Sequence, residues 1–346
     1  MDQLCNILIM KRSSKGIALL LICSMLPVIT LIVSCKKTEN PIKFPQGIFP
    51  DTTLNITDIN SVYDDFNTSC YVLNGDIILV FSSNRGSSGG QFDLVQGEIT
   101  FTFDQTDGEF GFGSEITNDA FLSKLLKTAN TSGNDYGPFR IFSSEDGYEY
   151  MLLSSENSSG NLDFYYLKNR PVFGTTLPDI LGPFPVSLLN TSYDDSYICL
   201  DTNQDTLYFS SDAGGNFDIY FKKRPSETAL SEWFGTSYSV SATVDSINSS
   251  NDDKCPVVSR KYMVFASNRP GGLGGYDLYY SICKSGKWGK AHNFGPDINT
   301  SANEYRPVLV THEDFSNYLM IFSSDRSGGK GEYDLYLRGV SFTGLE

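Results

Sequence analysis

Histidine is almost absent from this 346-residue chain, which contains only His292 and His312. The two lie in different units of the repeat described below, so a histidine-based metal cluster or catalytic triad in each unit is excluded. The sequence also lacks the GxSxG, P-loop and dinucleotide-binding motifs. Because these absences leave little support for catalysis, we expect a protein that is not an enzyme.

Basic residues are also few: 26 Lys and Arg stand against 41 Asp and Glu, a formal charge of −15. So acidic a chain lacks the basic patches with which proteins bind nucleic acid or anionic lipid by charge. No nucleic acid partner is expected. The excess of acid suits basic partners or cations, or serves solubility alone.

Cysteine has no metal-type or disulfide-type spacing, because no CxxC pair occurs among the seven residues. Neither a disulfide framework nor a zinc site is indicated. Cys70, Cys199 and Cys255 fall at similar points of three repeat units. We expect buried free thiols there, with a Cys199–Cys255 bridge as the alternative.

A hairpin-like segment recurs five times and dominates what the sequence does contain. Its clearest copy, KYMVFASNRPGGLGGYDLYYS at 261–281, has an apolar run, a small polar corner, a glycine-rich turn and a second strand-like run. The aspartate of the second run recurs at Asp93, Asp163, Asp218, Asp277 and Asp334. Self-similarity at 55–70 residues predicts repeated supersecondary units, none able to bury its apolar face alone.

A second motif precedes each hairpin: an asparagine in a loop, followed five residues later by an acid. These acids are Asp65, Asp135, Asp195, Asp253 and Glu304. Each unit therefore reads as a loop and four antiparallel strands, the content of a propeller blade. We predict an all-β propeller of five four-stranded blades at about 55–115, 116–178, 179–238, 239–294 and 295–346. Six blades, with a degenerate unit within 96–128, are the alternative.

The N-terminus has the pattern of a secretory signal: three basic residues, an apolar run at 16–33 and small residues before Cys35. That ending resembles the lipobox of bacterial lipoproteins, in which the cysteine is lipidated. We interpret 1–34 as the signal peptide, with Cys35 lipidated, and 35–54 as a tether and closing strand for the ring. A transmembrane anchor is the alternative, which Pro27 and the Ser34-Cys35 ending disfavour.

The blade motifs resemble a known family. FASNRPGGLGGYDLYYS followed by KWGKAHNFGPDINTSANEYRPVL is similar to the WD40-like β-propeller repeats of bacterial envelope proteins, including the periplasmic propeller of the Tol system. The resemblance covers about 55–340. It implies a non-catalytic outer-membrane lipoprotein, on the periplasmic side or the cell surface. Its monomeric propeller would be a scaffold for an envelope protein, contacted through loops 105–130 and 222–240 with exposed Phe110, Phe112, Trp233 and Phe234.

The repeated polar residues have structural and functional interpretations. The hairpin aspartates can accept hydrogen bonds at the corner and lock each blade. Arg85, Arg269 and Arg326 end three corners and can pair with the acids of the second motif. Those five acids form a ring on one face, which can bind Ca²⁺ or a basic peptide, or stabilise a turn, the interpretation that we favour. No cofactor other than Ca²⁺ is indicated, and the sequence does not identify a metal site.

A carbohydrate function is the rival hypothesis. Some five-bladed propellers are glycosidases that place carboxylates in an axial funnel, and glycoside cleavage needs two well-spaced acids. The acid ring could supply them, either for cleavage or for carbohydrate binding. Against cleavage, the five acids are near-equivalents, whereas catalytic acids occupy unlike environments that separate their pKa values.

Overall fold

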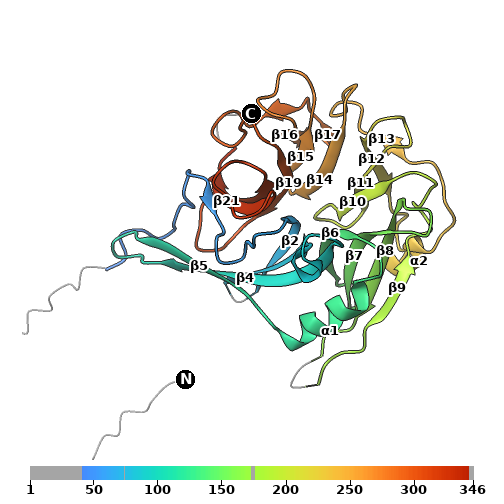
Figure 1. Cartoon of the computed structure of the whole chain (residues 1–346), viewed down its shortest axis with the longest axis horizontal. Helices are drawn as coiled ribbons and strands as arrows, with labels where there is room; N and C mark the ends of the chain where they lie inside the picture. The colour runs from blue at the N-terminus through green and yellow to red at the C-terminus, as the bar shows by residue number, and fades with distance from the viewer. Residues whose placement is uncertain (1–40, 74, 173–175, 343–346) are drawn as a thin grey trace, which may run out of the picture. The chain divides into compact units, whose positions relative to one another are not determined.

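Five β-sheets stand around a central axis in the computed structural model, which describes residues 41–73, 75–172 and 176–342. One strand of each sheet lies beside the axis, and the other strands follow outward from it (Figure 1). The predicted five-bladed propeller is therefore confirmed. The signal peptide and Cys35 lie outside the described residues.

The blades follow chain order. Blade one contains β2 (Asp65–Leu73), β3 (Asp76–Ser83), β4 (Asp93–Phe103) and β5 (Phe110–Ile116). Blade two contains β6 (Asp135–Ser143), β7 (Tyr148–Glu156), β8 (Leu162–Asn169) and β9 (Leu181–Pro185). Blade three contains β10 (Asp195–Leu200), β11 (Thr206–Ser211), β12 (Asp218–Lys223) and β13 (Ala242–Thr243).

Blades four and five have short outer strands. Blade four contains β14 (Asp253–Ser259), β15 (Tyr262–Ser267) and β16 (Asp277–Lys284), with β17 (Lys287–Trp288) and β18 (His292–Asn293) both paired to β16. Blade five contains β19 (Glu304–Val310), β20 (Tyr318–Ser324), β21 (Asp334–Val340) and β1 (Leu54–Asn55). The outer strand of the last blade thus comes from the N-terminal side of the chain, as predicted.

Within the described ranges two α-helices pack beside the blades, and a 3₁₀ turn, η1 (Arg85–Ser87), lies at the corner of blade one. Helix α1 (Ala120–Ala129) begins where the Asp119 side chain accepts a hydrogen bond from the Leu122 N–H, an N-cap that satisfies one free amide. Its leucines pack against core residues of blades one and two. The short α2 (Leu230–Phe234) buries its apolar side chains against blades two and three.

A loop asparagine joins each blade to the one before it. The Asn60 Nδ2 donates to the Leu335 carbonyl at 2.9 Å, and the Leu335 N–H donates to the Asn60 Oδ1 at 2.8 Å. The same pair of bonds joins Asn130 to Leu94, Asn190 to Phe164, Asn248 to Ile219 and Asn299 to Leu278. The repeated asparagine therefore satisfies backbone groups that would otherwise be buried unpaired between blades.

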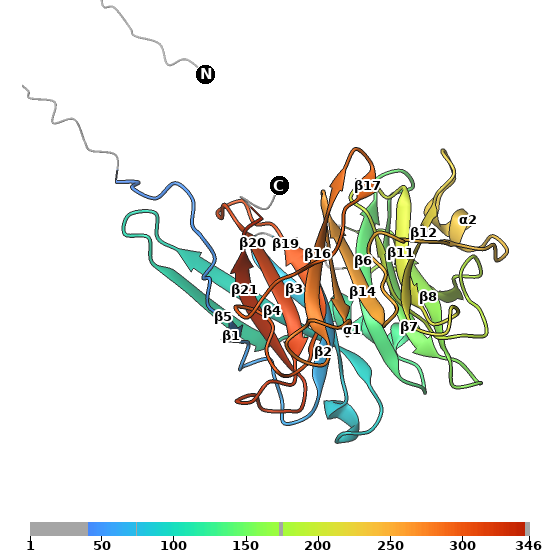
Figure 2. The same ribbon diagram turned by 90° about the horizontal axis from the view of Figure 1, so that it is seen from above.

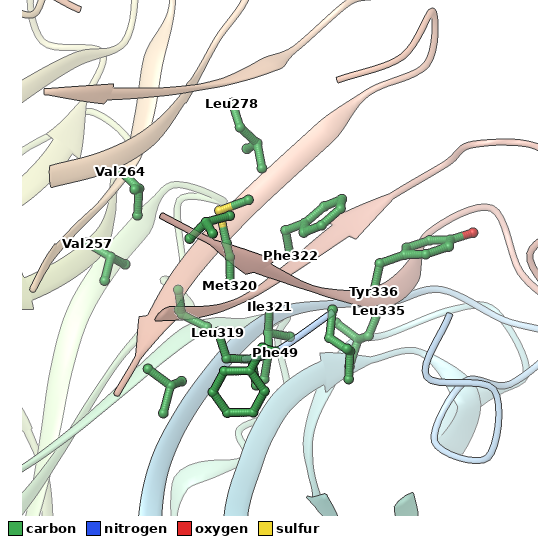
Figure 3. Close-up of a cluster of buried hydrophobic side chains, with 14 of the residues drawn as sticks. Phe49, Val257, Val264, Leu278, Leu319, Met320, Ile321, Phe322, Leu335 and Tyr336 are labelled. Carbon is green, nitrogen blue, oxygen red and sulfur yellow. The ribbon is translucent and has the colours of Figure 1, made fainter. Parts of the chain in front are cut away.

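The N-terminal segment closes the ring. Strand β1 pairs antiparallel with β21, and residues 43–44 bond to the turn between β4 and β5, alongside which the chain runs (Figure 2). Phe49 is fully buried and stacks on Phe315, with ring centroids 3.8 Å apart. It belongs to the large core of blades one, four and five (Figure 3). Closure leaves few strand edges open to aggregation.

Replacing Phe49 with alanine should remove this anchor. Loss of a buried aromatic ring leaves a cavity and should lower the free energy of unfolding by about 3–5 kcal/mol, measured by urea denaturation. The matched variant Phe44→Ala, at a ring that is 44% exposed, should change it little. Equal effects of the two variants would show that Phe49 does not anchor the closure.

Candidate functional site

The five acids of the second motif each stand at the first residue of an inner strand, and each is fully buried within its own blade. A loop N–H four residues upstream donates to each carboxylate, at 2.6 Å from Ser61 to Asp65 and at 2.8 Å from Thr191 to Asp195. They therefore do not line an open axial funnel. The five blades differ in which groups compensate the buried carboxylate.

An arginine clamps the acid in blades one, four and five. In blade one the Arg85 Nη2 donates to Asp65 at 2.5 Å and to the Ile59 carbonyl at 2.7 Å, and its Nε donates to the Ser83 hydroxyl at 3.0 Å. The guanidinium lies 5.3 Å from the Phe81 ring. The equivalent contacts are made by Arg269 in blade four and by Arg326 in blade five.

Blades two and three lack this arginine. Asn157 occupies its place in blade two, where the Asp135 oxygens accept from the Thr131 N–H, the Thr131 hydroxyl and the Ser155 hydroxyl. In blade three Ala213 stands in its place, because its N–H approaches the Ser211 hydroxyl at 3.4 Å as the Arg85 N–H approaches Ser83 at 3.3 Å. The backbone of the corner is retained, but the guanidinium is missing.

A cavity of about 180 Å³ opens at this place in blade three. Its inner wall repeats the surroundings of Arg85: Leu189, Asp195, Phe209 and Ser211 correspond to Ile59, Asp65, Phe81 and Ser83. We call the space bounded by Leu189, Asp195, Phe209, Ser211 and Ala213 the blade-three slot. Thr191, Tyr220, Tyr238, Val240 and Ser241 complete its lining.

Asp195 is the uncompensated charge of the slot. Its Oδ2 accepts from the Thr191 N–H and hydroxyl; the nearby Ser211 hydroxyl favours the carboxylate, but Oδ1 has no hydrogen bond of normal geometry within the described part of the chain. Burial raises the pKa of Asp195 to about 6, although hydrogen bonds oppose the rise. Burial likewise raises the pKa of Asp135 to about 6. Both carboxyls thus titrate near neutrality, the range suited to general acid catalysis.

A second carboxylate lies on the same face of blade three. Asp195 is paired with Ser211, and Ser211 is paired with Asp218, so the three side chains form one row across the sheet. Two strand spacings place the aspartate Cα atoms roughly 10 Å apart. Burial raises the pKa of Asp218, whose Oδ1 has no hydrogen-bond partner among the described residues.

The hairpin aspartates of blades four and five bind their own turns. Asp277 accepts from the Leu273 N–H at 2.7 Å and the Gly274 N–H at 3.0 Å. Asp334 accepts from the Lys330 N–H at 2.6 Å and the Gly331 N–H at 3.1 Å. Asp93 and Asp163 instead accept from the side chains of Gln91 and Asn157.

Aromatic side chains fill the axis beside the acids. Phe66 packs against Tyr136 of blade two and Tyr333 of blade five, and Tyr197 of blade three packs against Tyr305 of blade five. The expectation of exposed Trp233 and Phe234 was wrong, since both are buried with α2. Phe110 and Phe112 are partly buried and pack against the core around Phe49.

The described part of the chain has neither a metal-binding cluster nor a membrane-spanning helix. Within residues 41–73, 75–172 and 176–342, no group of three or more His, Cys, Asp or Glu side chains is placed to hold a metal ion. No helix in the same ranges is long and apolar enough to cross a membrane. Cys70, Cys199, Cys255 and Cys283 are free thiols, so no Cys199–Cys255 bridge is formed.

Comparison with known proteins finds a shared fold. No protein-family model matches the sequence, and no curated protein sequence matches it. Among solved structures, a GH43_1 enzyme from Xanthomonas citri has a TM-score of 0.53 at 10% identity, covering 85% of this chain and 92% of that one.

Two further glycosidases are similar in structure. The catalytic domain of the Coprinopsis cinerea GH62 α-L-arabinofuranosidase has a TM-score of 0.51 at 13% identity, covering 85% of this chain and 97% of that domain. The endo-arabinase from Bacteroides thetaiotaomicron has a TM-score of 0.50 at 11% identity, covering 86% and 98%. At these identities the likeness establishes the propeller fold.

These neighbours correct our prediction of function. The non-catalytic scaffold, and with it the expectation that the chain is not an enzyme, is contradicted, because the folds that match most of the chain are those of carbohydrate-cleaving enzymes. The repeat motifs misled us for a physical reason. They specify the turns and clamps inside each blade, and these do not determine what the propeller binds.

Removing an acid should have different effects in blades three and four. Because the pKa of Asp195 is raised to about 6 in the folded chain, its ionisation opposes folding; stability relative to Asp195→Asn should therefore fall as pH rises from 4.5 to 7.5. Asp253→Asn removes the partner of Arg269 and should cost about 3–5 kcal/mol at pH 7.5. Urea unfolding at both pH values measures each variant; a pH-independent difference for Asp195→Asn would contradict the assignment.

Proposed function

We propose that this protein acts on carbohydrate and takes one sugar residue into the blade-three slot. The observation that carries the proposal is the uncompensated carboxyl of Asp195 in an open cavity, at a place that three other blades fill with arginine. Hydroxyl groups of a sugar can donate to the carboxylate oxygen that lacks a partner. The likeness in fold to glycosidases supports the same class of ligand.

The size and lining of the slot fit a small polar ring. Its volume of about 180 Å³ is below the ~300–1,000 Å³ of pockets that hold drug-sized ligands. Tyr220 and Tyr238 offer aromatic faces, and Ser211 and Thr191 offer hydroxyl groups. Tyr238 is 52% exposed and Val240 is 85% exposed, so the mouth is open to solvent for the rest of a glycan.

Glycoside cleavage is the reaction that the two carboxyls support. Asp195, protonated below about pH 6, would donate its proton to the glycosidic oxygen as the bond to the anomeric carbon breaks. Asp218 would accept a proton from the water that attacks that carbon from the opposite side.

Anchoring in the bacterial envelope remains part of the proposal. The likeness of the blades to WD40-like envelope repeats and the lipobox-like ending at Cys35 support an outer-membrane lipoprotein. An acidic propeller on a lipidated tether would hold its slot near polysaccharide, either in the periplasm or at the cell surface.

Filling the slot or removing its acid should abolish the cleavage of carbohydrate. Ala213→Arg supplies the guanidinium that the other blades have, and Asp195→Asn removes the acid; both should lower turnover of polysaccharides and aryl glycosides by at least 10²-fold. Asp297→Asn, at an exposed acid, is the matched control and should retain activity.

The screen uses purified wild-type chain first, with glycan binding measured in parallel. Binding without turnover would reduce the function to carbohydrate recognition. Turnover that survives Ala213→Arg would place the reaction elsewhere in the propeller.

Lipidation predicts a membrane-bound chain. Cys35→Ser should move the protein from the membrane fraction to the soluble fraction, measured by immunoblot after fractionation. Ser34→Ala, which keeps the cysteine and a small residue before it, should leave the protein in the membrane fraction. A Cys35→Ser chain that stays there would contradict the anchor.

A further inference from the structure

Arg306 is the largest fully buried side chain among the described residues. It sits on the inner strand of blade five, at a bulge between Tyr305 and Val308 where its φ is 46°. A guanidinium cannot be deprotonated in a protein, so the positive charge stays in the interior.

The contacts of Arg306 leave the guanidinium unneutralised. Its Nη2 donates to the Pro138 carbonyl of blade two at 3.2 Å, which places the side chain across the axis from its own blade. The ring of Tyr197 lies 5.5 Å away. Its Nε and Nη1 find no hydrogen-bond partner, and no ion pair reaches it, within residues 41–73, 75–172 and 176–342.

A cavity of about 140 Å³ adjoins this side chain. All five blades contribute to its wall, and most of the lining residues lie in the middle or the second half of the inner strands, away from the acids that begin them. The lining residues are Ser69, Cys70, Phe139, Arg140, Thr202, Val257, Val258, Ser259, Arg306, Val308 and Leu309. No carboxylate is among them, and two are arginines.

The neighbouring thiols do not supply the missing charge. The positive charge of Arg306 favours the thiolate form of Cys70, Cys199 and Cys255 and so acts to lower the pKa of each. Burial outweighs that effect and raises the pKa of each thiol to about 12, so the three remain protonated at neutral pH.

The second arginine of the wall is only partly satisfied. Arg140 pairs with Glu149 through Nη2 and lies 4.1 Å from the Tyr71 ring. Its Nε and Nη1 have no hydrogen-bond partner in the part of the chain that the structure describes. Arg140 also lines a neighbouring pocket with Tyr71 and Glu149, so Arg306 is the cationic side chain of this cavity that no acid pairs with in the described part of the chain.

We propose that this axial cavity binds a small inorganic anion, held by Arg306. A buried charge without a partner is strongly unfavourable, and an anion from solvent is the partner that the lining can accept. Bound there, the anion would link blade five to blade two through Arg306. The site is separate from the blade-three slot and does not depend on the proposed function.

Replacing the anion in the buffer tests the proposal on the intact chain. At constant ionic strength, exchanging sodium gluconate for sodium chloride should raise the Tm by about 2–5 °C and saturate, since a ligand that binds the folded state alone stabilises it. Arms with bromide, sulfate and phosphate distinguish a halide from an oxyanion.

Arg306→Met, which keeps an unbranched side chain, should abolish the chloride dependence of the Tm, whereas Arg170→Met at an exposed arginine should retain it. If Arg306→Met does not fold, bromide-soaked wild-type crystals give the second readout. An anomalous peak within hydrogen-bonding distance of Arg306 would support the proposal. A wild-type Tm indifferent to chloride, bromide, sulfate and phosphate alike would overturn it and leave water in the cavity.

Discussion

The structure depends on one interaction, the buried carboxylate that begins each inner strand. A carboxylate taken out of water must be compensated, and hydrogen bonds from the preceding loop provide only part of what it needs. Arg85, Arg269 and Arg326 supply the rest in three blades, and each guanidinium also ties the loop carbonyl and the corner serine to the acid. The clamp therefore fixes the turn, the corner and the inner strand together.

Blades two and three depart from this rule, and blade three, where a cavity opens beside the acid, is where we propose that the protein functions. Blade three keeps the acid, the corner serine and the aromatic ring of the clamp but replaces the arginine with Ala213. The loss of the guanidinium opens a cavity and leaves Asp195 with a raised pKa. Perturbed groups in open cavities mark functional sites because structural acids are normally compensated. Five near-equivalent acids thus become unlike through their neighbours alone.

Much of the fold could be read from the sequence, because local chemistry repeats there. The regular spacing of the hairpin aspartates from Asp93 to Asp334 predicted five blades. The similarity of residues 49–51 to the outer-strand motif at 294–297 predicted that the N-terminal segment closes the ring. The slot was visible as Ser-Ser-Asp-Ala at 210–213 against Ser-Ser-Asn-Arg at 82–85, had the corners been compared one by one. Trp233 was misplaced because burial depends on tertiary packing, and Arg306 meets Pro138 across 168 positions, a contact that no local pattern encodes.

The most direct test of the account is the pKa of Asp195, measured by NMR titration of carboxyl carbons and assigned by the signal that Asp195→Asn removes. We expect a midpoint near pH 6 in the wild-type chain and a fall of at least one pH unit in Ala213→Arg, where the added guanidinium favours the carboxylate. A midpoint near the ordinary aspartate value of about 3.9 in the wild type would contradict it. The slot would then hold no uncompensated acid.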